Sequence, residues 1–150
     1  MPNTPDTPQP ATDIDPKRLA LVATATRNMA LILDAGGCIE WVNQAFEKHT
    51  GYSLNSVRGK LPNQVLAGPD TDLETVSRIH RHLFRGEASE EDILHYTANG
   101  EPYWVHTYCT PVDGEEGIEP GFVVIQTNIS DRKNSERGLR IAASVFDRSH

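Results

Sequence analysis

Alternating apolar and polar residues divide the middle of the chain into short strands and helices. Val, Ile, Tyr and Trp recur at every second position in several runs that are bounded by Gly, Asn or Pro, which is typical of strands packed on one face. Strands are predicted over residues 29–34, 38–43, 91–98, 102–112 and 121–129. The Asn99-Gly100 pair is a strong hairpin signal between the third and fourth strands.

The region between the second and third strands predicts helices. A short helix over 44–50 ends at Gly51, and Ser53 can cap one more helical turn. A longer helix ends at Gly86 and begins near Thr71, whose spacing to Glu74 matches a capping box. The apolar face of this helix is predicted to contain Leu73, Val76, Ile79 or His80, Leu83 and Phe84. The stretch before it, GKLPNQVLAGPDTD at 59–72, is predicted as a loop.

This order of elements predicts an α+β fold. Two strands, several short helices and three more strands form an antiparallel five-stranded sheet with helices on one side. The ends differ from this core, because the first residues are rich in Pro, Thr, Asp and Gln and cannot bury enough apolar surface to fold. The predicted organisation is a disordered segment (1–14), an amphipathic helix (15–27), the folded domain (28–130), and a C-terminal helix or linker (131–150).

Charge and hydropathy exclude several classes of partner. The formal net charge is -7, and residues 131–150 carry five basic against three acidic side chains, so the folded part is acidic. Such a surface lacks the basic face that nucleic acids require. Apolar runs are too short to span a bilayer, and the proline-rich beginning lacks the apolar stretch of a secretory signal. Cys38 and Cys109 form no CxxC motif, which favours reduced thiols and a cytoplasmic location.

Catalytic and metal-binding patterns are missing from the sequence. No Ser/His/Asp or Cys/His arrangement and no phosphate-binding glycine motif stands out, so no catalytic residue is predicted. His80 and His82 are two positions apart on a helix and face different directions, which makes them a poor metal pair. We predict that they face solvent or the helix end. The chain is therefore predicted to be a regulatory module and not an enzyme.

Four motifs together resemble one known family. ILDAGGCIEWVNQAFEKHTGYS, GPDTD, ANGEPYWV and FVVIQTNISDRK are similar, in this order and spacing, to the PAS sensor domain, and most closely to its flavin-binding LOV-like branch. The resemblance implies a five-stranded antiparallel sheet whose concave face and helices enclose one ligand cavity. It also implies control of an attached effector such as a kinase, diguanylate cyclase or phosphodiesterase.

The resemblance further implies a flavin, FAD or FMN, bound by side chains of the last three strands. Gln126 matches one of the ring-binding amides, while His95 and Val105 stand where two others are expected. Histidine can donate or accept a hydrogen bond, whereas valine can do neither, and Gln126 could instead bond a neighbouring backbone group. Asn128, on the same strand face as Gln126, and Asn63 complete the predicted set. Haem is not expected, because Thr75-Val76 stands where haem-binding relatives place an axial histidine.

The loop that carries the photoactive cysteine in LOV domains differs here. Pro62 or Asn63 occupies that position, and Cys38 and Cys109 lie on strands elsewhere. If this alignment holds, the cysteinyl photocycle is excluded. The predicted function is redox or small-ligand sensing through a flavin without a cysteinyl adduct. The alternative is a ligand-free PAS module that serves only for dimerisation and spacing.

Two partners are predicted. A downstream signalling domain would receive the signal through the C-terminal helix. A second copy of the chain would pair through the N-terminal helix and the outer face of the sheet, because Leu19, Leu21 and Val22 give that helix an apolar side that needs burial.

Overall fold

The computed structural model describes residues 25, 27–114, 119–131 and 133. The predicted segments 1–14 and 15–27 lie outside these residues, except for two positions, as does nearly all of 131–150. The N-terminal dimer contact therefore stays a prediction. None of the helices in the described part of the chain is both long and apolar enough to cross a membrane.

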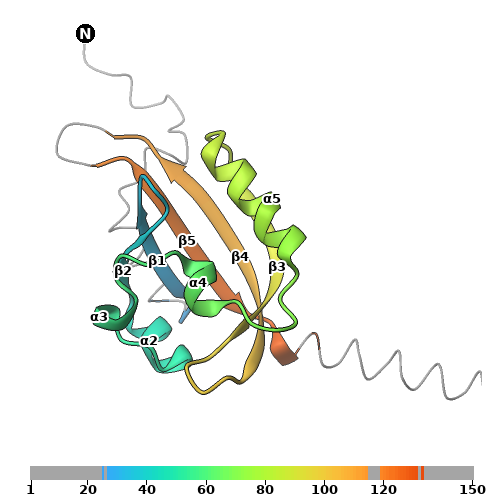
Figure 1. Ribbon diagram of the computed structural model, residues 1–150. Coiled ribbons are helices and arrows are strands. Elements are labelled where there is room, and N and C mark those ends of the chain that lie inside the picture. Colours follow the sequence, from blue (N-terminus) through green and yellow to red (C-terminus); the bar gives the residue numbers. More distant parts are fainter. Residues whose placement is uncertain (1–24, 26, 115–118, 132, 134–150) are drawn as a thin grey trace, which may run out of the picture.

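Five antiparallel strands form one sheet in the order β2-β1-β5-β4-β3 (Figure 1). The strands are β1 (Met29–Asp34), β2 (Ile39–Val42), β3 (Ser89–Tyr96), β4 (Pro102–Val112) and β5 (Gly121–Asn128). This confirms the predicted α+β fold, with β1 and β4 matching their predicted bounds. The β3 strand begins and ends two residues earlier than predicted, because its pairing with β4 runs from Ser89 opposite Cys109 to Tyr96 opposite Pro102.

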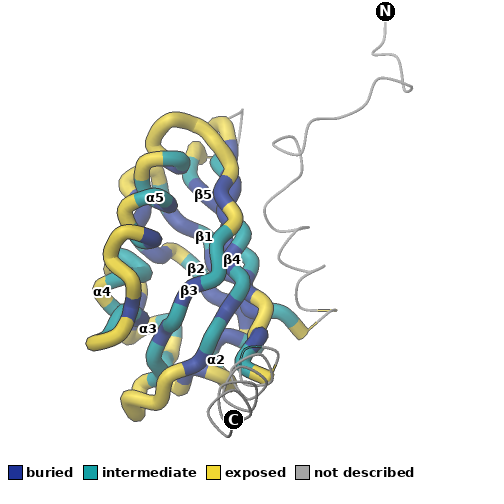
Figure 2. The backbone as a smooth tube through the Cα atoms, turned by 90° about the vertical axis from the view of Figure 1, so that its right-hand side faces the viewer, coloured by how far each residue is buried: buried dark blue, intermediate teal, exposed yellow. Residues whose placement is uncertain are grey.

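Four short helices cover one face of the sheet: α2 (Gln44–Thr50), α3 (Leu54–Val57), α4 (Pro62–Leu66) and α5 (Leu73–Phe84). Figure 2, turned by 90°, shows α3, α4 and α5 on the same side of the strands. Asn43 is the N-cap of α2, and its side-chain oxygen accepts from the N–H of Phe46 and also from that of Ala30 on β1, both at 3.0 Å. This one side chain caps the helix and ties it to the sheet. Gly51 ends the helix in the left-handed conformation at φ 79, as its position predicts.

The α4 helix lies inside the stretch that was predicted as a loop, so that prediction was wrong. Pro62 stands at the first helical position, where its missing N–H costs nothing. Leu61 has no side-chain acceptor to cap the helix, but Gln64 Oε1 accepts from the Leu61 N–H at 3.0 Å. Five residues with one proline give too short a pattern for helical periodicity to be seen in the sequence.

The N-cap of α5 lies one residue later than the predicted Thr71. Asp72 is the N-cap, and its carboxylate accepts from the Glu74 N–H at 3.1 Å and from the Thr75 hydroxyl at 2.9 Å. The side chain of Thr71 is engaged elsewhere, since its hydroxyl donates to Leu94 O on β3 at 2.8 Å.

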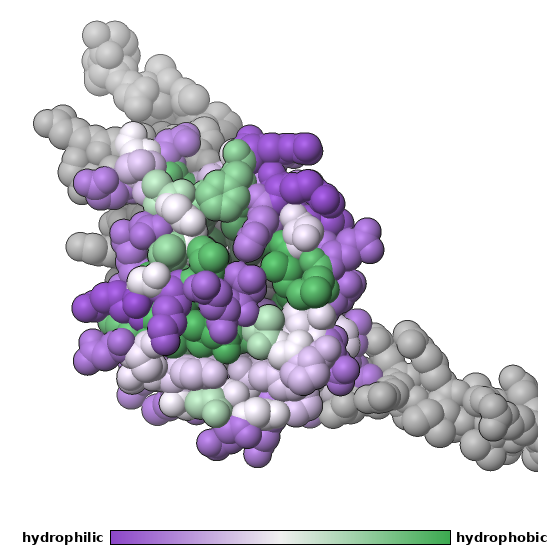
Figure 3. All heavy atoms as spheres, in the orientation of Figure 1, coloured by the Kyte–Doolittle hydropathy of each residue, from purple (hydrophilic) through white to green (hydrophobic). Residues whose placement is uncertain are grey.

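The predicted apolar face of α5 is only partly buried. Ile79 and Leu83 pack into the core, whereas Leu73 and Phe84 are 72% and 58% exposed. Figure 3 shows hydrophobic side chains reaching the surface on the helix-covered face, among hydrophilic ones.

The core lies between the inner face of the sheet and the helices. Along β4 the inward residues alternate with outward ones, as strand geometry requires. The inward set is Tyr103, Val105, Thr107 and Cys109, and all four are buried. Trp104, His106 and Tyr108 point to the other face and are partly exposed.

Candidate functional site

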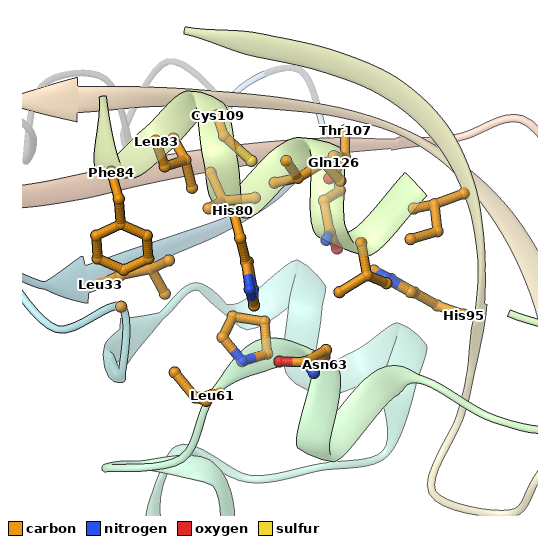
Figure 4. Close-up of a pocket in the computed structure, with 16 residues that line it drawn as sticks. Leu33, Leu61, Asn63, His80, Leu83, Phe84, His95, Thr107, Cys109 and Gln126 are labelled. Atoms are coloured by element: carbon orange, nitrogen blue, oxygen red, sulfur yellow. The ribbon is translucent and has the colours of Figure 1, made fainter. Parts of the chain in front are cut away.

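A cavity lies between the inner face of the sheet and helices α4 and α5 (Figure 4). The space between these walls is about 610 Å³ when the solvent-filled opening is included. Most of its wall is apolar, and this part of the lining includes Leu33, Val76, Ile79, Leu83, Ile93 and Val124. Such a wall suits the apolar part of a ligand.

Four buried polar atoms on the lining residues have no hydrogen-bond partner among the residues that the structure describes. They are Asn63 Oδ1, His95 Nδ1, Thr107 Oγ1 and Gln126 Oε1. Buried polar groups in folded proteins are almost always paired, because an unpaired one costs about 1–3 kcal/mol. Four such atoms around one cavity make it a candidate site for a ligand with hydrogen-bonding groups.

Strand pairing fixes the positions of two of these side chains. Gln126 on β5 lies opposite Thr107 on β4 and opposite Met29 on β1, so its backbone is held on both sides. His95 lies on β3, whose whole length is paired with β4. Asn63 faces the cavity from α4, on the opposite wall (Figure 4).

The segment between α4 and α5 is tied to the outer strand of this sheet. Asp70 N–H donates to the Tyr96 hydroxyl at 3.0 Å, and Gly68 N–H donates to Thr71 Oγ1 at 2.9 Å. With the bond from Thr71 to Leu94, these contacts hold the segment after α4 against β3. They fix the distance between the wall that carries Asn63 and the wall that carries the strand residues.

The four polar side chains are all able to donate and to accept. The amides of Asn63 and Gln126 carry both an oxygen and an NH₂ group, and the hydroxyl of Thr107 does both as well. Burial lowers the pKa of His95 to about 4, so its imidazole is neutral at pH 7 and presents one donor and one acceptor. The site is therefore suited to a neutral ligand edge on which donors and acceptors alternate.

The sequence profile of the PAS domain family matches residues 27–131, which is the whole sheet with its helices. This chain belongs to the PAS domain family. Several of the similar proteins belong to its LOV-like branch. One is blue-light-activated histidine kinase 1 of Erythrobacter litoralis, which is 31% identical over 144 residues covering 91% of this chain and 40% of the kinase. The PAS chain thus spans less than half of this relative.

Solved structures agree with this assignment. The LOV domain of the Erythrobacter litoralis EL346 blue-light-activated histidine kinase has a TM-score of 0.60 at 31% identity, covering 69% of this chain and 95% of that one. A second structure, from a flavin-analogue study of the light-oxygen-voltage domain mechanism, has a TM-score of 0.70 at 24% identity and covers 90% and 98% of the two chains. At that identity the second comparison shows the fold alone.

Three of the five predicted ligand residues line the cavity of this PAS domain, namely Gln126, His95 and Asn63. The other two do not. Val105 points inward but is fully buried in the core beside the cavity. Asn128 is exposed, its Nδ2 lies 3.3 Å from His49 Nε2, and its Oδ1 accepts from the Ser130 N–H at 2.9 Å.

Cys109 lies closer to the site than its strand position suggested. Its side chain belongs to the cavity lining, two residues along β4 from Thr107, whereas Cys38 lies outside the lining. Burial raises the pKa of the Cys109 thiol to about 12. A thiol that stays protonated is a weak nucleophile, so Cys109 acts here as a small apolar wall residue.

His80 and Thr107 were not expected in the site. His80 was predicted to face solvent or the helix end, yet it lines the cavity from α5 (Figure 4). Thr107 could have been found from the sequence, since it shares a strand face with Val105. The described residues contain no group of three His, Cys, Asp or Glu side chains able to hold a metal ion.

Proposed function

We propose that this PAS domain is a sensor module whose cavity binds a flavin, FAD or FMN, and reports redox state or ligand occupancy to an effector. The observation that carries the proposal is the set of four buried polar atoms around one largely apolar cavity, which have no partner in the described part of the chain. Similarity to LOV domains of blue-light-activated kinases supports the choice of a flavin over other flat heteroaromatic ligands.

The residues present fit the ring system of such a cofactor. The apolar wall suits the two faces of a planar ring, and the side chains of Gln126, Thr107 and Asn63 suit its polar edge. A bound flavin would supply reversible redox chemistry, and reduction changes the hydrogen-bonding character of its ring edge. Gln126 can present either its oxygen or its NH₂ group, so its amide can follow that change.

The proposal does not include a cysteinyl adduct. Asn63 faces the cavity from α4, the element in which LOV photochemistry would place its thiol. An amide cannot replace a thiol as a nucleophile. Cys109 lies in the opposite wall, on the sheet, with a strongly raised pKa.

Signal output is proposed to pass through the segment that follows β5. The relative from Erythrobacter litoralis is a kinase of which this chain spans 40%, which supports an effector elsewhere in a longer polypeptide. The Trp104 N–H donates to Ser130 Oγ at 2.9 Å, and Lys133 Nζ lies 3.3 Å from Asp92 Oδ2 and 5.1 Å from the centre of the Trp104 ring. The start of this segment is thus attached to the two strands, β3 and β4, that carry His95 and Thr107.

The test is the visible absorption spectrum of the purified protein, before and after incubation with FMN or FAD. We expect flavin absorbance that stays with the protein on gel filtration. Gln126→Leu should shift this spectrum or lower the affinity, and Thr127→Val, on the exposed outer face of the same strand, should do neither. A colourless protein that takes up neither flavin would contradict the proposal and favour the ligand-free dimerisation module.

A further inference from the structure

The cavity has polar side chains but no formally charged ones. None of its described lining residues is a lysine, arginine, aspartate or glutamate. The buried hydrogen-bonding groups come from two amides, a hydroxyl and a neutral imidazole, at Asn63, Gln126, Thr107 and His95, and the His80 side chain also lines the cavity. This matters because FMN and FAD carry phosphate groups that riboflavin lacks.

Basic residues occur close to the lining in sequence but remain outside it. Lys60 precedes Leu61, and Arg81 follows His80, yet both are exposed and neither lines the cavity. Sites that bind a phosphate specifically use charge-assisted hydrogen bonds, commonly from the planar guanidinium of an arginine. An exposed lysine or arginine near the opening gives only a weak attraction, which salt screens.

We infer that the cavity selects its ligand by a neutral heteroaromatic ring and gives no advantage to a phosphate or adenylate on the ligand's tail. The ligand class is a flat ring system with donors and acceptors along one edge, and riboflavin satisfies it as well as FMN or FAD. This inference rests on the proposed flavin site and specifies which part of the flavin that site recognises.

His80 is the position at which a charge can be introduced to test this. It extends from α5 toward the side of the cavity where Leu61 and Asn63 lie (Figure 4), and its ring contacts Phe84 edge-on with centres 6.3 Å apart. An arginine at this position would place a permanent cation in the lining. His82, on the same helix, lies outside the lining and pairs with Glu87 at 3.7 Å, so it serves as a matched control.

The experiment measures the dissociation constants of riboflavin, FMN and FAD for the ligand-free protein by quenching of flavin fluorescence, at low and at high salt. For the wild-type protein we expect the three constants to lie within about fivefold of one another, and to converge as salt is raised. His80→Arg should strengthen FMN binding by about tenfold relative to riboflavin. His82→Arg should leave the ratio unchanged.

Each outcome separates the inference from the function on which it rests. If the wild-type protein binds FMN more than about thirtyfold more tightly than riboflavin at high salt, the inference is wrong and the flavin site still stands. A ratio of that size requires direct charge-assisted hydrogen bonds to the phosphate, since exposed charges contribute little at high salt. Failure of all three ligands to bind would overturn both. The ratio of the wild-type dissociation constants for riboflavin and FMN tests the inference even if His80→Arg does not fold.

Discussion

Thr107 and Gln126 are direct cross-strand neighbours on β4 and β5, and both line the same cavity. Each has a buried side-chain oxygen with no hydrogen-bond partner among the described residues. Side chains in such a pair have Cβ atoms about 4.5–5.5 Å apart, so one ligand edge can reach both. The β5 strand is paired on both sides, with β1 and β4, which leaves this part of the backbone little freedom. The sheet thus holds two hydrogen-bonding groups at a fixed spacing before any ligand arrives.

The first prediction concerns Thr107→Val. In the ligand-free protein this change should raise the free energy of unfolding by about 1 kcal/mol, because it removes a buried hydroxyl that has no protein partner. It should also weaken flavin binding by several-fold, so stability and affinity move in opposite directions. Urea unfolding and ligand titration measure the two effects. A Thr107→Val protein that is less stable without ligand would show that the hydroxyl has a partner after all.

The second prediction is a loss of stability in mild acid. The pKa of His95 is about 4 in the folded protein and 6.5 as its ordinary value, so between these limits the unfolded chain binds the extra proton. The stabilising contribution is complete above pH 6.5 and is lost progressively as pH falls toward 4. From this cause the free energy of unfolding should fall by about 2 kcal/mol between pH 7 and pH 5.

The measurement is urea unfolding at these two pH values for the wild-type protein and for His95→Gln. Between pH 7 and pH 5 the free energy of unfolding of His95→Gln should change by about 2 kcal/mol less than that of the wild-type protein. The contributions of the other acidic and histidine residues are the same in both proteins and cancel in this comparison. Thr127→Val, at an exposed position without a titratable side chain, is the control and should keep the wild-type difference. An unchanged pH dependence in His95→Gln would contradict the assigned burial.

The third prediction concerns the close contact of Gly68 with Tyr96. A Cβ atom added at Gly68 would overlap the Tyr96 ring, whose hydroxyl accepts from the Asp70 N–H. Gly68→Ala should therefore lower the free energy of unfolding by about 1–3 kcal/mol, as overpacking usually does. Gly36→Ala is the control, since its Cβ would only meet Asp34 Oδ1 at 3.4 Å. Equal stability of the two variants would show that the Tyr96 ring moves aside freely.

The strands were predictable because their signals are local. The β1 strand is a short apolar run, along most of β4 buried residues alternate with partly exposed ones, and Gly100, at φ 83, stands in the turn between β3 and β4. Gly51 likewise ended α2 where expected. The start of α5 was misplaced because Thr71 and Asp72 are both good caps. A tertiary hydrogen bond from Thr71 to Leu94, which the sequence does not show, decides between them.

The site was only partly predictable because a cavity depends on packing between distant elements. Gln126 and His95 could be named from the resemblance to LOV-like domains. His80 and Cys109 could not be placed, because helix and strand periodicity say which residues share a face, not which face meets the cavity. Asn128 shares a strand face with Gln126, but it lies at the last residue of β5, where the sheet ends and solvent begins.

The fourth prediction distinguishes the two thiols. Cys38 is partly exposed next to a turn, whereas Cys109 is 3% exposed and has a pKa raised to about 12. A thiol-specific disulfide reagent at pH 8 should therefore modify about one thiol quickly, and Cys109 only as the protein unfolds. Cys38→Ser should abolish the fast phase, and Cys109→Ser should leave it intact. A fast phase that persists in Cys38→Ser would mean that the cavity opens readily to solvent.

The last prediction concerns light. With flavin bound, illumination should cause no reversible loss of visible absorbance of the kind a cysteinyl adduct gives, because the α4 wall presents Asn63 and the Cys109 thiol lies in the sheet. Asn63→Cys should introduce such a loss, with recovery in the dark, since it places a thiol on α4 facing the cavity. Gln64→Cys, at the next and exposed position, should not. Reversible bleaching of the wild-type protein that disappears in Cys109→Ser would show that Cys109 reacts, and would replace redox sensing with light sensing as the role of this cavity.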